Sequence, residues 1–317
     1  MFREIHIPEY FDHNAVDAVL KEADEIKSSP NKATEGIKFD FTKANFISPV
    51  GGLVVSKIAS DFPEYKCLAV YQKEKEKEHI PWMMKVMGIT KADETGEINE
   101  FLDKFRVPIQ RCFYSSDSLK AINEKLIPIV KEKYNPSKNV LKSLNWGLWE
   151  AIDNAGVHGY GQDPSAKIKV PYPKPVTFCA WAYKDEIEIG ILDSGQGIRN
   201  SFTNSGIGKY KCLSNTEALK IAIQKGETSN PENSMGFGLY GCAELARQSG
   251  GHLVIISTGN KLVLDDKGIN IYDSYTYNGT IVSLCLSKKM DINLDSIFGK
   301  NSFMATEDFD DILGDYE

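Results

Sequence analysis

Residues 149–158 read Trp149-Glu150-Ala151-Ile152-Asp153-Asn154-Ala155-Gly156-Val157-His158. In a helix, steps of four residues place Glu150, Asn154 and His158 on one face. The opposite face carries an apolar stripe at intervals of three to four residues, as a core-facing side does: Leu141, Leu144, Leu148, Ile152 and Ala155. A carboxylate can orient or deprotonate water, and an amide oxygen suits Mg2+. The polar stripe is therefore either a catalytic and metal-binding face or the ordinary polar face of a surface helix.

The length and composition of the chain are those of a globular protein. It has 317 residues, which predicts two domains, with 42% hydrophobic residues and a formal net charge of -7. The negative charge argues against nucleic acid as the main partner. The sequence has no apolar run near the ~20 residues of a membrane helix and no pattern of a signal peptide. We therefore expect a cytoplasmic protein that does not bind membranes.

The cysteines are widely scattered, with no C-x-x-C pair and no histidine cluster beside them. We expect reduced thiols, mostly buried, because neither a zinc site nor a disulfide framework has this spacing. The six residues are Cys67, Cys112, Cys179, Cys212, Cys242 and Cys285.

The order of the segments predicts an α+β fold with two domains and a tail. Residues 1–103 alternate helix-like and strand-like segments, with a helix at 14–26 and strands at 37–41 and 67–71. This pattern predicts a small α/β domain. Residues 291–317 are rich in acidic side chains, and we expect a flexible tail there.

Residues 104–290 form the larger predicted domain. Glu and Ile alternate from Glu186 to Ile189, which predicts a strand with one face exposed to water. Helices interleave with mostly hairpin-connected strands, and this order predicts helices on one face of a mixed sheet. The expected strands are 106–113, 176–183, 186–192, 252–257 and 280–286, and the expected helices are 119–131, the stretch around Glu150, 216–224 and one that starts near Gly238.

A second polar cluster follows the strand that ends at Leu192. It reads Asp193-Ser194-Gly195-Gln196-Gly197-Ile198. An acid at the end of a strand accepts hydrogen bonds with fixed geometry, for example from an exocyclic amine, and glycines let a flat ring or a backbone approach closely. The same residues also form ordinary turns.

A third cluster opens the helix near Gly238. It reads Asn233-Ser234-Met235-Gly236-Phe237-Gly238-Leu239-Tyr240-Gly241. Backbone N–H groups at such a helix start bind anions without a charged side chain. The glycines satisfy G-x-G-x-x-G, but no buried strand precedes them, so the dinucleotide-binding interpretation is excluded.

The three clusters, in this order, resemble the GHKL ATPase superfamily of gyrase, heat-shock chaperone, histidine kinase and mismatch-repair ATPases. The resemblance covers about residues 104–288 and ends with Gly279-Thr280-Ile281-Val282-Ser283-Leu284. It implies a Bergerat fold, an α/β sandwich that binds ATP and Mg2+ under a mobile lid.

The resemblance also implies roles for individual residues. Glu150 stands where the family keeps its catalytic base, and Asn154 stands where it keeps its Mg2+ ligand. Asp193 would bind the adenine amino group, and the lid would cover residues 226–234. The other implied ATP-binding residues are Gly195, Gly197 and Ile198 on the adenine side, Gly236, Phe237, Gly238 and Leu239 at the phosphates, and Thr280 near the adenine-bound water.

The branch of the family is open. Residues 150–160 look most like the serine kinases that act as anti-sigma factors, whereas residues 248–257 look more like a sensor histidine kinase. No histidine of the chain is followed by the acidic residue usual after a phosphoacceptor, and His158 is expected to support the site. We expect slow ATP hydrolysis or transfer of phosphate to Ser or Thr of a regulatory partner. The alternative is a nucleotide-dependent switch or scaffold that binds ATP without phosphotransfer.

Residues 37–53 resemble, at low specificity, the strand, loop and helix start of STAS domains, the partners that such serine kinases phosphorylate. Val50 stands where those domains carry the phosphoacceptor, so phosphate cannot be accepted there. Ser48 is expected to cap a helix. We expect the N-terminal domain to serve docking or dimerisation, with a homodimer forming on ATP binding and a STAS-type or transcription-related protein as partner.

Overall fold

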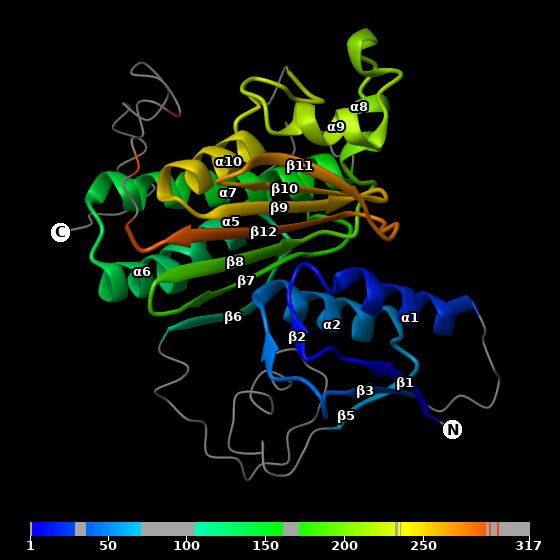
Figure 1. Cartoon of the computed structure of the whole chain (residues 1–317). Coiled ribbons are helices and arrows are strands. Elements are labelled where there is room, and N and C mark those ends of the chain that lie inside the picture. Colours follow the sequence, from blue (N-terminus) through cyan, green and yellow to red (C-terminus); the bar gives the residue numbers. More distant parts are fainter. Residues whose placement is uncertain are drawn as a thin grey trace.

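The computed structural model describes residues 2–28, 36–70, 105–160, 171–231, 234, 236–289, 292 and 297. In these residues, one large sheet lies between two layers of helices, and a small sheet lies beyond the second layer (Figure 1). The predicted α+β class is confirmed. The boundary expected at residues 103–104 and most of the tail at 291–317 lie outside the described residues.

The large sheet has seven strands in the order β11-β10-β9-β12-β8-β7-β6. Every neighbouring pair of strands is antiparallel, so the prediction of a mixed sheet was wrong. Short turns join β7 to β8, β9 to β10 and β10 to β11, and strands joined by so short a connection must run in opposite directions. Five strands lie where the sequence predicts them, and the β10–β11 hairpin was missed. The bounds are β6 Arg106–Cys112, β7 Val176–Ala182, β8 Glu186–Leu192, β9 His252–Ser257, β10 Asn260–Asp265, β11 Gly268–Asp273 and β12 Thr280–Ser287.

Helices on the first face of the sheet position the polar clusters. The expected helix at 119–131 is broken by a π-helical turn, η2, directly before Pro128, which has no N–H to continue the α-helical ladder. The elements are α5 Ser115–Ala121, η2 Ile122–Leu126, α6 Ile127–Tyr134, α7 Lys138–Tyr160, α8 Ile198–Thr203, the 3-10 turn η4 Gly208–Tyr210, α9 Asn215–Ala222 and α10 Gly238–Ser249.

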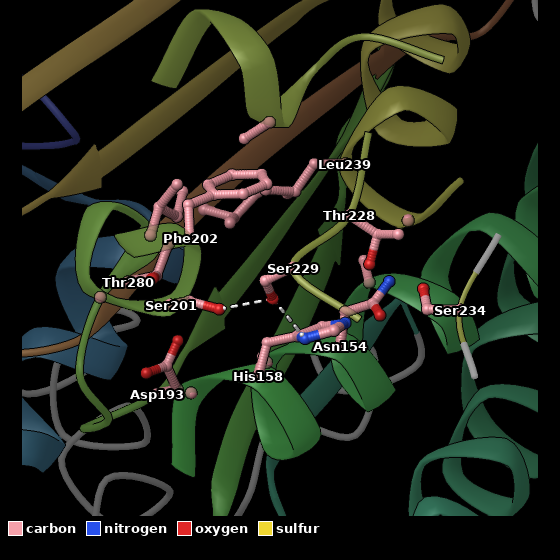
Figure 2. A pocket seen from close by; sticks show the side chains of 18 of the residues that line it. Asn154, His158, Asp193, Ser201, Phe202, Thr228, Ser229, Ser234, Leu239 and Thr280 are labelled. Atoms are coloured by element: carbon pink, nitrogen blue, oxygen red, sulfur yellow. Dashed lines mark hydrogen bonds between the residues drawn. The ribbon is translucent and has the colours of Figure 1, made fainter. Parts of the chain in front are cut away.

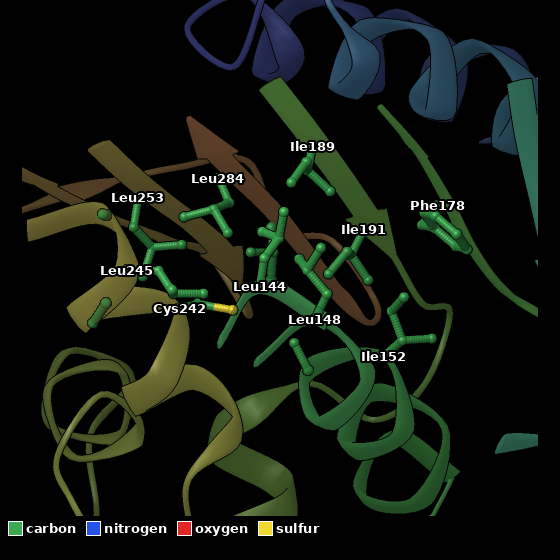
Figure 3. Packing of buried hydrophobic residues seen from close by; sticks show 14 of the residues in the cluster. Leu144, Leu148, Ile152, Phe178, Ile189, Ile191, Cys242, Leu245, Leu253 and Leu284 are labelled. Atoms are coloured by element: carbon green, nitrogen blue, oxygen red, sulfur yellow. The ribbon is translucent and has the colours of Figure 1, made fainter. Parts of the chain in front are cut away.

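The main core lies between these helices and the sheet. Leu144, Leu148 and Ile152, all from the predicted apolar stripe of α7, are buried against β8 (Figure 3). Gly147 lets α10 approach α7, because a Cβ at this position would lie 2.8 Å from Leu245 Cδ1. The apolar stripe thus fixes α7 on the sheet and turns its polar stripe away from it.

The N-terminal residues form a parallel sheet in the order β1-β3-β5, joined by helices α1 and α2. These two helices lie between the small sheet and the large one (Figure 1). The bounds are β1 Phe2–His6, β2 Tyr10–Phe11, α1 Val16–Ser28, β3 Gly36–Asp40, β4 Phe46–Ile47, α2 Pro49–Asp61 and β5 Lys66–Val70, with β2 and β4 paired in parallel.

Helix α2, from the N-terminal residues, covers the second face of the large sheet, whereas the described helices of residues 104–290 lie at its first face, as the sequence predicts. Helix α2 contacts β7, β8 and β12. Gly190 allows this approach, because a Cβ there would lie 2.9 Å from Leu53 Cδ1 and 3.2 Å from the Val50 nitrogen. The apolar side of the N-terminal helices is thereby buried within the chain itself.

Ser48 begins α2 as the predicted helix cap. Its Oγ accepts a hydrogen bond from the Gly51 N–H at 3.1 Å, and Pro49 occupies the first turn, where no N–H is needed. Ser48 is fully buried. The serine two residues before the STAS-like phosphoacceptor position therefore caps a helix that faces the large sheet.

Glu188 corrects the expectation of a water-exposed face on β8. Only 9% of the residue is exposed, because α2 covers it, and its Oε1 accepts a hydrogen bond from Ser283 Oγ at 3.2 Å. Burial raises the pKa of Glu188 to about 7, although hydrogen bonds from Ser283 and Ser48 oppose the shift. Alternation in the sequence could not reveal that a distant helix covers the polar side of this strand.

We expect Glu188→Gln to stabilise the protein at pH 8 by about 3 kcal/mol at most, the equivalent of the raised pKa. A carboxyl group with a raised folded-state pKa contributes stability below its unfolded pKa of 4.5 and loses it as the pH rises through about 7. Urea unfolding of both proteins at pH 4 and pH 8 measures the effect. If the two proteins differed in free energy of unfolding by the same amount at pH 4 and at pH 8, this expectation would be contradicted.

None of the described helices combines the length and the apolar character needed to cross a membrane. All six cysteines are free thiols, and four of them are buried, as the sequence predicts.

Candidate functional site

A cavity of about 720 Å³, including the open space at its mouth, lies at one end of the large sheet. Figure 2 shows side chains from α7, the end of β8, α8, β12 and the segments before α10 around this space. Its described lining includes Ala151, Asn154, Ala155, His158, Gly159, Ile191, Asp193, Gly197, Ile198, Ser201, Phe202, Ala222, Glu227, Thr228, Ser229, Ser234, Gly236, Gly238, Leu239, Thr280 and Val282.

The cavity brings together eight of the eleven site residues that the sequence singled out. These are Asn154, Asp193, Gly197, Ile198, Gly236, Gly238, Leu239 and Thr280. Glu150, Gly195 and Phe237 are absent from its described lining. The three clusters, which lie between Asn154 and Leu239 in the chain, thus meet in one place.

Asp193 lies at the end of β8 beside β12. Its backbone N–H donates to the Thr280 carbonyl at 3.0 Å, and its Oδ1 accepts from the Gly195 N–H at 2.8 Å. The residue is 1% exposed, and burial raises the pKa of its carboxyl group to about 7, against opposing hydrogen bonds from Gly195 and Thr280. A buried carboxyl held in this way is a directional acceptor for an N–H group of a ligand.

The glycines after Asp193 pack the loop against α7. A Cβ at Gly195 would lie 2.2 Å from the Gly159 carbonyl oxygen, to which the Gln196 N–H donates at 2.7 Å. Gly195 therefore touches the protein and not the cavity, which differs from the role that the sequence suggested. Gly197 has φ +76° at the start of α8 and lines the cavity, where a Cβ would lie 2.6 Å from Thr258 Cγ2.

The start of α10 lies against the polar stripe of α7. A Cβ at Gly238 would lie 2.0 Å from Asn154 Nδ2 and 3.2 Å from the Glu150 carbonyl oxygen. Phe237, which precedes the helix, makes no side-chain cap. Backbone N–H groups at a helix start can bind an anion, and those of α10 lie next to the Asn154 amide.

Phe237 does not face this space, although the sequence placed it at the phosphates. Its ring packs edge-on against Trp146 at 5.9 Å and near Tyr240 at 6.3 Å, with Lys225 Nζ 5.7 Å from its centre. The aromatic side chain thus joins α10 to α7. Its position follows from packing that only the tertiary structure shows.

Glu150 lies one turn before Asn154 on α7 and is half-buried. The carbonyl of Glu150 is beside Gly238, but its side chain is not part of the described lining of the cavity. The structure therefore places the expected base close to the start of α10 and next to the cavity, without bringing it among the lining residues.

The described part of the expected lid, residues 226–231 and 234, borders the cavity. Glu227 accepts hydrogen bonds from Lys209 Nζ at 2.8 Å and from the Tyr210 hydroxyl, which anchors the segment to η4. The Gly226 N–H donates to the Gly236 carbonyl at 3.3 Å. Residues 232, 233 and 235 of this region lie outside the described residues.

Ser229 connects this segment to both sides of the cavity. Its Oγ shares hydrogen bonds with His158 Nδ1 and with Ser201 Oγ, each at 2.9 Å (Figure 2). His158 thus holds the segment in place, in agreement with the supporting role expected for it. Sequence reasoning missed Ser201 and Ser229, because isolated serines in polar loops carry no spacing signal.

Besides the Asn154 amide, the described lining of this cavity includes the side chains of Asp193, Glu227 and His158, which do not form a group with metal-like spacing. In the part of the chain that the structure describes, one group of three histidine or acidic residues has metal-like spacing, and it consists of Glu4, His6 and Asp40 in the small sheet. Lys38 Nζ lies 2.6 Å from Glu4 there and competes with any cation. A metal in the main cavity would need oxygens from its ligand.

No family model matches the chain, and no curated protein matches its sequence.

Proposed function

We propose that the chain is an Mg-ATP-binding regulatory protein of the GHKL, histidine-kinase-like ATPase type, with a Bergerat-type domain. The observation that carries this proposal is the meeting of Asp193, Asn154 and the uncapped start of α10 around one cavity. An adenine amino group needs a fixed acceptor, and phosphates need backbone N–H groups and a cation. These three features supply such groups on different sides of the cavity.

The residues present fit both ATP and Mg2+. Asp193 would accept the N–H of the adenine amino group, and Thr280 on β12 lies beside it. The α10 start would bind the phosphates, and the Asn154 oxygen would hold Mg2+, which when bound neutralises phosphate charge. Ser229 would keep the loop near His158 until the nucleotide enters.

Glu150 would deprotonate water or a Ser or Thr hydroxyl of a partner protein. In either reaction the attacking oxygen forms a bond to the γ-phosphorus, ADP leaves, and Glu150 takes the proton. The partner protein, a homodimer in the ATP-bound state and a cytoplasmic location belong to the same proposal. A second candidate, a switch or scaffold that binds ATP without phosphotransfer, is favoured by the absence of Glu150 from the described lining.

The reaction is tested by incubating the purified protein with γ-labelled ATP and Mg2+, alone and with candidate STAS-type proteins. We expect label in free phosphate or in a partner protein. ATP binding without either product would favour the switch, and no ATP binding at all would exclude both candidates.

We expect Gly238→Ala to weaken Mg-dependent ATP binding about tenfold, while the protein stays folded. The added Cβ would lie 2.0 Å from Asn154 Nδ2, so the amide must move, and a side-chain end moves at small cost. Calorimetric titration of ATP with Mg2+ and with EDTA measures the effect. Gly208→Ala is the matched control, because a Cβ there meets nothing within 4 Å. Equal losses with and without Mg2+ would contradict the metal role of Asn154.

A further inference from the structure

A second cavity, of about 850 Å³ including the space at its mouth, lies between the N-terminal helices and the segment that precedes β12. Helices α1 and α2 form one side, residues 275–278 form another, and Lys174 and Ser194 complete it. Its described lining shares no residue with that of the first cavity. It is therefore a separate space that neither the resemblance nor the proposed function accounts for.

Positive charge exceeds negative charge in this cavity, in a chain whose formal net charge is -7. Lys27, Lys57 and Lys174 line it, with Asp24 and Asp61 as the described acidic residues. The single carboxylate of Asp61 serves two lysines, since Lys27 Nζ lies 2.6 Å from its Oδ2 and Lys57 Nζ binds its Oδ1. Two lysine side chains thus share the negative charge of one carboxylate.

The remaining acid is also engaged. Asp24 accepts a hydrogen bond from the Tyr275 hydroxyl at 3.0 Å and lies 3.9 Å from Lys27 Nζ. Burial lowers the pKa of Lys57, and the charge of Lys174 adds to this shift. Lys174 itself is exposed, and the structure gives it no ion pair among the described residues. Since Asp24 and Asp61 pair with Lys27 and Lys57, Lys174 leaves one positive charge in excess, which an anion in the cavity would offset.

We propose that this second cavity binds a small phosphate-bearing anion between Lys57 and Lys174. Thr276 and Asn278 line the same space and supply a hydroxyl and an amide as further donors. A small molecule fits better than a protein segment, because the space is enclosed by three separate parts of the chain. The binding of this anion does not depend on the proposed ATP site.

The two cavities are adjacent at Asp193 and Ser194, which line the first and the second respectively. Tyr277, also in the second lining, donates its hydroxyl to the Asp193 carbonyl at 2.7 Å. The anion would therefore alter ATP affinity, and ATP would alter anion affinity by the same factor. This coupling rests on the proposed function, whereas anion binding alone does not.

Titration calorimetry with inorganic phosphate, on the full chain and without nucleotide, tests the site. We expect millimolar or tighter binding by the wild type, and about tenfold weaker binding by Lys174→Glu. Lys267→Glu is the matched control, because Lys267 is an equally exposed lysine on the β10–β11 turn. Glycerol phosphate, run in parallel, should bind as well, since the recognised group is the phosphate.

Asn154→Asp separates the two cavities, because it puts a negative charge into the first one only. Phosphate binding that survives Asn154→Asp and is lost in Lys174→Glu supports the proposal. Binding that survives Lys174→Glu and is lost in Asn154→Asp belongs to the first cavity and overturns it, as does the absence of binding by the wild type. Phosphate binding without any ATP binding would leave this site standing and reject the proposed function.

Discussion

Asp193→Asn is expected to lower the affinity for ATP about a hundredfold while leaving the fold intact. In the proposed site the wild-type carboxylate, which is 1% exposed, would accept the N–H of the adenine amino group. An amide has nearly the same shape and can still accept from the Gly195 N–H, the bond that spans 2.8 Å in the wild type. Its own NH2 group, however, cannot accept from a second donor. Calorimetric titration with ATP measures the loss.

The pH dependence of ATP binding provides a second measurement on the same residue. Burial raises the pKa of Asp193 to about 7 in the unliganded protein, so the protonated form dominates below that pH. The adenine amino group needs the ionised form, and ATP affinity should fall as the pH drops from 8 to 6. Asp193→Asn should lack this dependence on pH.

Asp266→Asn is the control for the change itself, because Asp266 is an exposed residue of the β10–β11 turn. Unchanged ATP binding by Asp193→Asn would reject the position of the adenine. Weaker ATP binding by Asp266→Asn as well would show that the net charge of the protein, and not the buried acceptor, determines the affinity.

The parts of the site that the sequence predicts depend on local periodicity. Four-residue spacing places Asn154 and His158 on one face of α7, and the apolar stripe that includes Leu148 decides which way that face turns. The strand-end position of Asp193 and the helix start at Gly238 follow from equally local signals. Local signals thus predict each of the three segments, but not that the segments meet in one place.

The parts that the sequence does not predict depend on contacts between distant segments. Glu188 alternates with isoleucines as a water-facing residue would, yet α2 lies about 140 positions earlier in the chain and buries it. The hydrogen bonds of Ser229 with His158 and Ser201 join three elements in the same way. The β10–β11 hairpin was missed although its signal is local: β10 carries Leu262, Val263 and Leu264, and Ile269 and Ile271 alternate in β11. The burial of Glu188 and the hydrogen bonds of Ser229, in contrast, depend on long-range packing that no local window contains.

Glu150→Gln is expected to reduce the release of labelled phosphate, or its transfer to a partner protein, about a hundredfold. The backbone carbonyl of Glu150 lies beside Gly238, at the start of α10 where the phosphates are expected. An amide of the same size cannot take a proton from water or from a hydroxyl group. ATP affinity should change little, because Asp193, Asn154 and the α10 start remain, and this separates a base from a binding residue.

Single-turnover assays with γ-labelled ATP, at ATP concentrations above Kd, measure the chemical step for the wild type and the variant. Glu124→Gln is the control, because Glu124 is exposed on η2, away from the cavity. A variant that turns ATP over as fast as the wild type would remove Glu150 from the reaction. A variant that loses ATP binding as well would assign Glu150 to the support of α10. The absence of Glu150 from the described lining makes this test decisive, since a base must come within hydrogen-bond reach of the attacking oxygen when ATP is bound.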